Sequence, residues 1–169
     1  MQTVSERLLA ALKANGADFF VAVPCKLLSE IISLLERDSE VTYIAPNREE
    51  EGVGLCAGAY LAGKTPVILM QNSGLGNSLN ALCALTGFYQ LPLLMLMSHR
   101  GAPGEEIGAQ VPMGMASRPL LEACQIPAFS FSRGADAEAV GKLVGYARVA
   151  SRPVGVLLDF DFWREEGPR

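Results

Sequence analysis

Two short, uninterrupted apolar runs constrain the fold of this chain more than any other feature. Residues 65–72 read TPVILMQN and residues 91–99 read LPLLMLMSH, and neither run alternates between apolar and polar positions. Strands that are apolar on both faces need cover on both sides, which is typical of parallel sheets. Helical patterns separate these runs from the other strand-like segments. The sequence therefore predicts an α/β fold, a three-layer, doubly wound, mostly parallel sheet with helices on both faces.

The predicted helices and strands alternate along the chain. In order, they are helix 3–15, strand 18–24, helix 26–38, strand 41–46, a helix from the Glu-rich segment to Gly63, strand 65–72, helix 73–89, strand 91–99, a loop from Arg100 to Arg118, helix 119–124, strand 128–132, helix 136–150 and strand 153–160. The sequence contains no linker or internal repeat. We therefore expect residues 1–169 to form a single domain.

Composition excludes several classes of protein. The chain is 50% hydrophobic, only 19% charged and carries a formal net charge of −4, so neither disorder nor nucleic-acid binding is expected. Proline, glycine and polar residues interrupt the charge-free stretch 65–98, which argues against a membrane span, and no signal peptide is recognised. The four cysteines form no CxxC pair, which favours reduced thiols in a cytoplasmic protein.

Polar residues gather where the predicted strands end. Ligands of doubly wound sheets bind at the carboxyl ends of the strands, so these residues are candidates for a site. They are Pro24, Cys25, Lys26, Asn47, Glu49, Glu50, Glu51, Gln71, Asn72, Ser73, His99 and Arg100. The turn NSGLGN at residues 72–77 could present backbone N–H groups to a phosphate, or it could simply be a tight strand-to-helix connection.

The three consecutive glutamates have a partial structural explanation. Asn47 is a favourable N-cap, and Glu50, three residues later, fits a capping box. Acidic residues in a first turn also complement the helix dipole. The helix beyond them is apolar on every face, so we expect its body to be buried. For the same reason, hydrophobic periodicity does not show which of the three acids faces a site.

For the other candidate residues, the residue type by itself allows two interpretations. His99 could be structural or catalytic, and Lys26 could be solvated or bind an anion. The loop from Arg100 to Arg118 could be a surface connection or an active-site cover. No grouping of His, Cys or carboxylates has metal-ligand spacing, so no metal site is expected on this chain.

Taken jointly, the motifs resemble a known family. Residues 47–82, NREEEGVGLCAGAYLAGKTPVILMQNSGLGNSLNAL, are similar to the pyrimidine-binding domain of the thiamine diphosphate-dependent decarboxylases. VPCKLL at residues 23–28 and SHRG at residues 98–101 extend the resemblance, which covers essentially the whole chain. In that family a glutamate lies nine residues before a glycine of the following helix, and here Glu49 precedes Gly58 by that spacing.

The resemblance implies roles for particular residues. Glu49 would be the catalytic acid that hydrogen-bonds the aminopyrimidine ring of thiamine diphosphate, and His99 would be a second catalytic residue. The expected cofactor-binding residues are Glu49, Pro24, Asn72, Ser73, Gly74, Gly76 and Asn77. The expected substrate-binding residues are Lys26, Arg100 and Gln110, and the two cations among them suit an anionic substrate group.

The resemblance also implies a partner and a substrate class. The family holds Mg²⁺ and the diphosphate through a GDG motif with a downstream Asn, and this chain has no GDG. We therefore expect a separate beta subunit that carries this diphosphate-binding domain, in a heterooligomer of at least two copies of each chain. Conversion of sulfopyruvate to sulfoacetaldehyde and CO₂ in coenzyme M biosynthesis is the expected reaction. Phosphonopyruvate as substrate, or a non-catalytic phosphate-binding domain, are the alternatives.

Overall fold

The computed structural model describes residues 2–164, which contain one six-stranded sheet. Every strand pairing in it is parallel, in the order β2-β1-β3-β4-β6-β5. The strands are β1 (Phe19–Ala22), β2 (Thr42–Ile44), β3 (Pro66–Gln71), β4 (Leu93–Ser98), β5 (Ala128–Phe131) and β6 (Pro153–Leu158). The predicted parallel α/β sheet is confirmed, and the two continuous apolar runs are its central strands β3 and β4.

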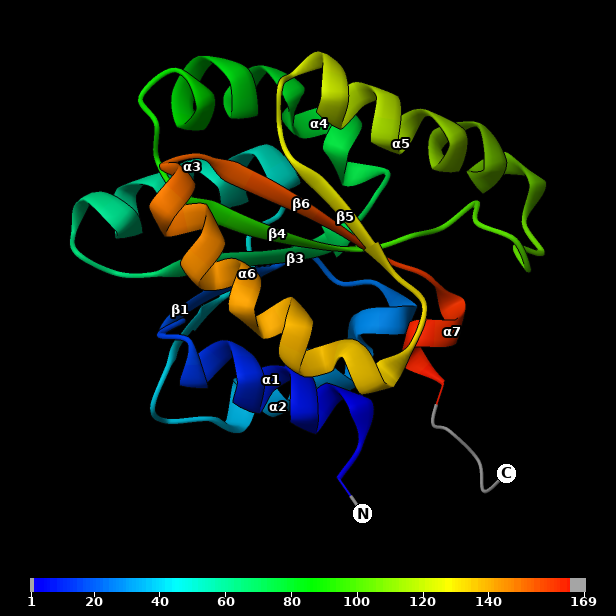
Figure 1. Cartoon of the computed structure of the whole chain (residues 1–169), viewed down its shortest axis with the longest axis horizontal. Coiled ribbons are helices and arrows are strands. Elements are labelled where there is room, and N and C mark those ends of the chain that lie inside the picture. Colours follow the sequence, from blue (N-terminus) through cyan, green and yellow to red (C-terminus); the bar gives the residue numbers. More distant parts are fainter. Residues whose placement is uncertain (1, 165–169) are drawn as a thin grey trace.

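Helices cover both faces of the sheet (Figure 1). One layer contains α1 (Val4–Ala14), α2 (Ser29–Arg37) and α6 (Ala137–Ala150), and the other contains α3 (Glu49–Leu61), α4 (Gly74–Ala81), the π-helical η2 (Leu82–Gly87) and α5 (Val111–Ala123). Short 3₁₀ turns lie at η1 (Lys26–Leu28), η3 (Gly108–Gln110) and η4 (Gly134–Asp136), and α7 (Phe160–Trp163) is one turn long. None of the helices within residues 2–164 has the length and apolar character needed to cross a bilayer.

The core has two halves, one on each side of the sheet. Val67 and Leu69 of β3 face the α1, α2 and α6 layer, whereas Ile68 and Met70 face the α3, α4 and α5 layer. All four side chains have no exposed surface. Because successive strand residues point to opposite faces, an uninterrupted apolar run is what a central strand between two helical layers requires.

The start of α3 differs from the prediction by one residue. Arg48, not Asn47, is the N-cap, so the back-reaching acid is Glu51, whose carboxylate accepts a hydrogen bond from the Asn47 N–H at 3.2 Å. Glu50, the expected capping-box residue, is exposed and lies 3.7 Å from Arg48. The expectation that α3 is buried on all sides is also wrong, since Gly54, Leu55 and Gly58 are exposed.

The predicted long loop from Arg100 to Arg118 is wrong in its second half. Helix α5 begins at Val111, and the predicted short helix 119–124 is only its end. Pro112 lies in the first turn, where backbone N–H groups have no intrahelical acceptor, so a proline there costs no helical hydrogen bond. Pro119 lies inside the helix and removes one main-chain hydrogen bond without ending it. The proline and glycine content therefore misled the sequence interpretation.

The contact between α1 and α6 yields a stability prediction. A Cβ on Gly141 of α6 would lie 2.7 Å from the Cβ of Ala11 in α1, whereas a Cβ on Gly145 would have no neighbour within 4 Å. We expect Gly141→Ala to lower the free energy of unfolding by about 1–3 kcal/mol through overpacking. Gly145→Ala, in the same helix, should raise it by about 0.5–1 kcal/mol. Urea unfolding measures both, and equal effects would contradict the assigned packing.

Candidate functional site at the carboxyl ends of the strands

Glu49 is the first residue of α3, and its side chain lies against two residues of the NSGLGN turn. Asn77 Nδ2 donates a hydrogen bond to Glu49 Oε2 at 3.2 Å. A Cβ on Gly74 would lie 2.6 Å from the carboxyl carbon of Glu49, so the acid occupies space that only glycine leaves free. Oε1 accepts no hydrogen bond from the described residues, and the side chain is half-buried. One oxygen is thus held and the other remains available to a ligand.

A polar cluster lies beside this turn, at the ends of β1, β3 and β4. Gln71 Nε2 donates to Ser73 Oγ at 2.6 Å and to Gln110 Oε1 at 3.1 Å. Gln71 Oε1 lies 3.7 Å from the Cys25 thiol, which is also 3.2 Å from Ser98 Oγ. Segments far apart in the sequence therefore meet at the predicted edge of the sheet. Gln71 connects all of them, although it was not among the predicted binding residues.

The Asn72 side chain is committed to contacts inside the chain. Its side chain is 1% exposed, and its Nδ2 donates to the Arg100 carbonyl at 3.0 Å and to Ser117 Oγ at 2.9 Å. Its Oδ1 accepts from the Arg100 N–H at 2.8 Å. Both amide hydrogens are used inside the protein. The Asn72 side chain therefore has no hydrogen-bond donor left for a cofactor, and the cofactor contact expected of Asn72 stays a prediction.

His99 and the segment after it form a compact loop. His99 Nε2 lies 3.2 Å from the Gly114 carbonyl oxygen, and since a carbonyl only accepts, Nε2 carries the proton. In the neutral ring Nδ1 is then an acceptor, and the described residues do not hydrogen-bond it. The loop starting at Arg100 therefore folds back on itself so that Gly114 reaches His99.

Arg100 forms a two-pronged ion pair with Glu105 rather than facing outward. Its Nε and an Nη lie 2.7 and 2.6 Å from the carboxylate oxygens, which also accept N–H bonds from Gly101 at 2.9 Å and Ile107 at 3.0 Å. The Glu105 side chain is 2% exposed, and the hydrogen bond from Arg100 is the main cause that lowers its pKa to about 2. The predicted anion clamp at Arg100 is therefore already filled by the chain's own carboxylate.

The remaining predicted residues lie at the same edge and are open to solvent. Pro24, Lys26, Gly76 and Asn77 are exposed, and Gln110 is half-buried in η3. The Lys26 ammonium makes no hydrogen bond or ion pair with the described residues, so its charge is available to an anion. Because these residues are exposed, the site is an open edge rather than an enclosed cavity.

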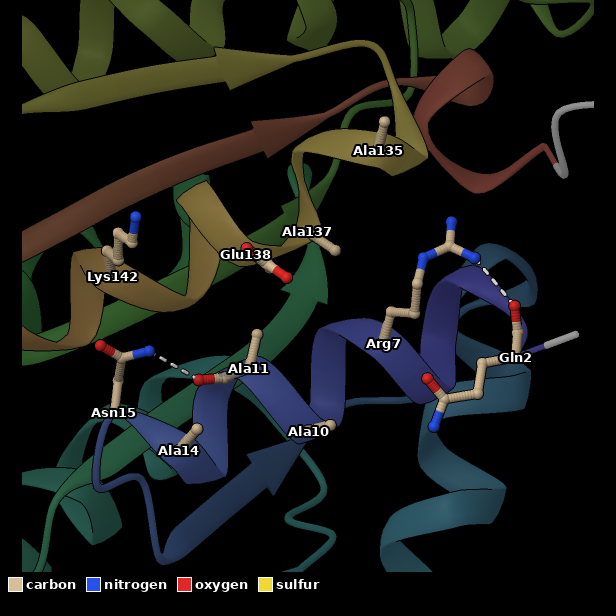
Figure 2. Close-up of a pocket in the computed structure, with 10 residues that line it drawn as sticks. All are labelled: Gln2, Arg7, Ala10, Ala11, Ala14, Asn15, Ala135, Ala137, Glu138 and Lys142. Atoms are coloured by element: carbon tan, nitrogen blue, oxygen red, sulfur yellow. Dashed lines mark hydrogen bonds between the residues drawn. The ribbon is translucent and has the colours of Figure 1, made fainter.

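Hollows occur elsewhere on the surface. One of about 420 Å³ lies between α1 and α6, where Arg7 and Lys142 flank a floor of alanines (Figure 2). Another, of about 740 Å³, runs along the exposed face of α3. Within residues 2–164, no group of three His, Cys, Asp or Glu side chains is arranged to hold a metal ion.

The comparisons with known proteins agree with this geometry. Residues 2–118 match the family model described as "Thiamine pyrophosphate enzyme, N-terminal TPP binding domain". The chain is 44% identical over 160 residues to a sulfopyruvate decarboxylase subunit alpha of Methanothermobacter thermautotrophicus, covering 94% of this chain and 97% of the relative. The chain therefore belongs to the thiamine pyrophosphate enzyme family and, within it, to the sulfopyruvate decarboxylase alpha subunits.

Other relatives are longer than this chain. A sulfopyruvate decarboxylase of Methanosarcina acetivorans is 40% identical over 117 residues, which are 69% of this chain but 30% of the relative. A phosphonopyruvate decarboxylase of Streptomyces viridochromogenes is 33% identical over 120 residues, 70% of this chain and 30% of the relative. The benzoylformate decarboxylase structure from Polynucleobacter necessarius superposes with a TM-score of 0.73 at 18% identity, over 100% of this chain and 32% of that one.

The residues at the strand ends fit the aminopyrimidine end of thiamine diphosphate. A ring nitrogen needs one carboxyl oxygen with free hydrogen-bonding capacity, and Glu49 Oε1 has it. Pro24 and Gly76 are exposed at the same edge, so the surface beside the turn is open to a ligand.

The Glu105 ion pair yields a prediction for the loop that it closes. Glu105→Gln removes the charge that holds Arg100, so we expect the 101–110 loop to be cut several-fold faster by a limiting protease. Glu106→Gln, the neighbouring exposed acid, should leave the rate unchanged. Equal cleavage in the two variants would show that Glu105 does not hold the loop.

The same pair sets a pH dependence. The pKa of Glu105 is about 2 in the folded chain, below the ordinary value of about 4.3 in an unfolded one. Its stabilisation is therefore complete above about pH 5 and is lost as the pH falls toward 2. Protection of the Ile107 and Gly101 amides against hydrogen exchange should decline over that acidic range in the wild type.

Proposed function

We propose that this chain is the alpha subunit of a thiamine diphosphate-dependent sulfopyruvate decarboxylase, which converts 3-sulfopyruvate to sulfoacetaldehyde and CO₂ in coenzyme M biosynthesis. The observation that carries the proposal is the placement of Glu49. Asn77 and Gly74 hold its carboxyl group at the carboxyl edge of the sheet with one oxygen free. The sequence identity of 44% to a chain named as that subunit supports the choice of substrate.

The chemistry divides between the cofactor and the chain. When bound, thiamine diphosphate supplies the electron sink that makes loss of CO₂ from a 2-keto acid possible. Glu49 would hold the aminopyrimidine ring nitrogen through Oε1 and exchange a proton with it. His99 offers Nδ1 as a proton acceptor beside the site, and Lys26 offers an uncommitted positive charge for the second anionic group of the substrate.

Arg100 can serve as the predicted clamp only if Glu105 gives way to the substrate. A sulfonate would have to replace a carboxylate that receives four hydrogen bonds. Lys26 needs no such exchange, so it is the better-supported cation for substrate binding. The contact between Arg100 and the substrate remains a prediction.

A beta subunit would supply the diphosphate and Mg²⁺ site through a GDG-containing domain. Two observations support a partner of this kind. Relatives that match most of this chain are named alpha subunits, and the chain spans only about a third of the benzoylformate decarboxylase chain that it resembles. The exposed edge around Glu49 would be completed by that subunit, in an assembly of at least two copies of each chain. We place this assembly in the cytoplasm.

Phosphonopyruvate is the second candidate substrate, because sulfonate and phosphonate make the same demands on Lys26 and on N–H donors. The phosphonopyruvate decarboxylase relative is less similar, at 33% identity. A direct assay separates the two: CO₂ release from each 2-keto acid, with this chain alone and with its partner. We expect CO₂ release from sulfopyruvate only when both chains are present. This activity should depend on thiamine diphosphate and Mg²⁺. No activity in any combination would favour a non-catalytic phosphate-binding domain.

Glu49 and Glu50 provide a matched pair of variants. Glu49→Gln should abolish decarboxylation by the assembled enzyme while leaving the fold and the binding of the partner unchanged. Glu50→Gln should be close to wild type, because Glu50 is exposed and its one ion-pair partner within residues 2–164 is Arg48. Steady-state CO₂ release measures both. Loss of activity in Glu50→Gln together with an active Glu49→Gln would show that Glu50, not Glu49, is the catalytic acid.

Exposed apolar side chains favour one face for the partner. Leu61 of α3 and Met115 of α5 are each 74% exposed, and Phe88, after η2, is 73% exposed, all in the helical layer that also carries Glu49. Exposed apolar surface that gathers on one face is typical of a docking surface, and on the opposite layer the described residues with large exposed apolar side chains are Tyr146 and Val149 of α6. We assign this layer to the beta subunit.

Charge introduced on this layer should weaken assembly. We expect Leu61→Lys to raise the dissociation constant for the partner roughly tenfold or more. Val149→Lys, at a 90% exposed position of α6 on the opposite layer, should leave it unchanged. Sedimentation of the two chains mixed in titrated ratios provides the measurement. A larger effect from Val149→Lys would place the partner on the other layer.

A further inference from the structure

Gln71, at the end of the central strand β3, joins three segments of the site. Its amide nitrogen donates to Ser73 in the turn after β3 and to Gln110 in η3, and its oxygen faces Cys25 after β1. An amide nitrogen carries two hydrogens, and these two acceptors use both of them. Gln71 therefore has no donor left for a ligand, and its effect on a ligand must pass through its neighbours.

The neighbour that Gln71 orients is Gln110. Because Gln71 donates to Gln110 Oε1 at 3.1 Å, the Gln110 amide is turned with its NH₂ group away from Gln71. That NH₂ group makes no hydrogen bond to the described residues, so two N–H donors remain for a ligand. An isolated glutamine side chain has no such preference between its oxygen and nitrogen faces. The contact with Gln71 fixes which face is presented.

The backbone of Gln110 is fixed independently of this contact. Gly101 has a φ of +80°, and a Cβ there would lie 2.9 Å from the Gln110 carbonyl carbon. The same loop is closed by Glu105, whose carboxylate binds Arg100 and the Gly101 N–H. With its backbone held, the remaining freedom of Gln110 is the rotation of its amide group, which Gln71 restricts.

Two of the polar side chains near Gln110, Arg100 and His99, are already bonded inside the chain. The Arg100 guanidinium is paired with Glu105, and His99 Nε2 is bonded to a carbonyl. An anionic group that reaches this edge therefore meets the Gln110 N–H groups and the exposed Lys26. Oriented N–H donors bind sulfonate, phosphonate or carboxylate oxygens through charge-assisted hydrogen bonds.

We propose that Gln71 is a positioning residue for substrate recognition: it turns the Gln110 amide so that its NH₂ group donates to the anionic group of the 2-keto acid. This inference rests on the proposed decarboxylase function and identifies how its substrate is held. Gln71 itself does not contact the substrate. Replacement of Gln71 should therefore raise KM for the 2-keto acid only in a chain that still has Gln110.

A double-mutant cycle in the assembled enzyme tests this dependence. The variants are Gln71→Met, Gln110→Met and the pair together, with Gln2→Met, an exposed glutamine at the amino terminus, as the matched control. KM and kcat for sulfopyruvate are measured by CO₂ release with the partner, thiamine diphosphate and Mg²⁺ present. Thermal unfolding and affinity for thiamine diphosphate are measured on the same assemblies.

We expect each single variant to raise KM roughly tenfold, the effect of one charge-assisted hydrogen bond, with kcat within about twofold of wild type. The double variant should match Gln110→Met, because Gln71 has nothing left to orient. Cofactor affinity and Gln2→Met should be unchanged. A product of the two effects, roughly a hundredfold, would overturn the proposal, as would an unchanged KM or a fall in kcat alone in Gln71→Met.

The wild-type assembly separates this inference from the proposed function. If wild type does not release CO₂ from sulfopyruvate, the proposed function fails and the role of Gln71 falls with it. If wild type is active and the cycle is multiplicative, the decarboxylase function stands and only the role of Gln71 is refuted. A single assay series therefore distinguishes the two failures.

Discussion

The buried amide of Asn72 is the contact on which the site geometry depends. It bonds to both the N–H and the carbonyl of Arg100 and to Ser117 of α5. Three segments are thereby held at fixed spacing: the turn after β3, the loop after β4, and the helix behind them. Glu49 rests on the first segment through Gly74, and Gln110 ends the second. An unpaired amide at this depth would be costly, so the arrangement is strongly favoured as a unit.

Several acids at this edge have partners within the chain itself. Glu105 pairs with Arg100, Glu50 lies near Arg48, and Glu51 accepts a hydrogen bond from the Asn47 N–H. Glu49 has no cation beside it among the described residues, and only one of its oxygens is bonded, by the Asn77 amide. The acid that the family resemblance selects therefore presents an unbonded oxygen to a ligand.

Much of the fold followed from the sequence, because β3 and β4 are apolar on both faces and only a covered parallel sheet accommodates them. The set of strand-end residues followed from the same reasoning, and most of that set does lie at one edge. The roles of individual residues did not follow. Asn72 has a polar side chain that could serve a ligand or the core, and its burial is decided by Ser117, 45 positions away. The ion pair between Arg100 and Glu105 likewise could not be predicted, because Glu105 lies in a segment for which the sequence predicts only a loop.

The helix α5 shows a second limit of sequence reasoning. Pro112 and Pro119 both have low helix propensity, yet Pro112 lies in the first turn of the helix and Pro119 is tolerated inside it. Packing of Leu121 against the sheet outweighs the single hydrogen bond that Pro119 removes. The position of Gln110 immediately before α5 depends on this early start, and so does the contact between Gln110 and Gln71.

Gly74 decides which rotamers Glu49 can adopt. A Cβ at position 74 would lie 2.6 Å from the Glu49 carboxyl carbon, so the observed rotamer is open only while this position is glycine. The Asn77 hydrogen bond then holds that rotamer in the chain itself. Part of the loss of side-chain entropy is therefore incurred during folding rather than during binding of the cofactor, and a neighbouring turn preorganises the carboxyl group.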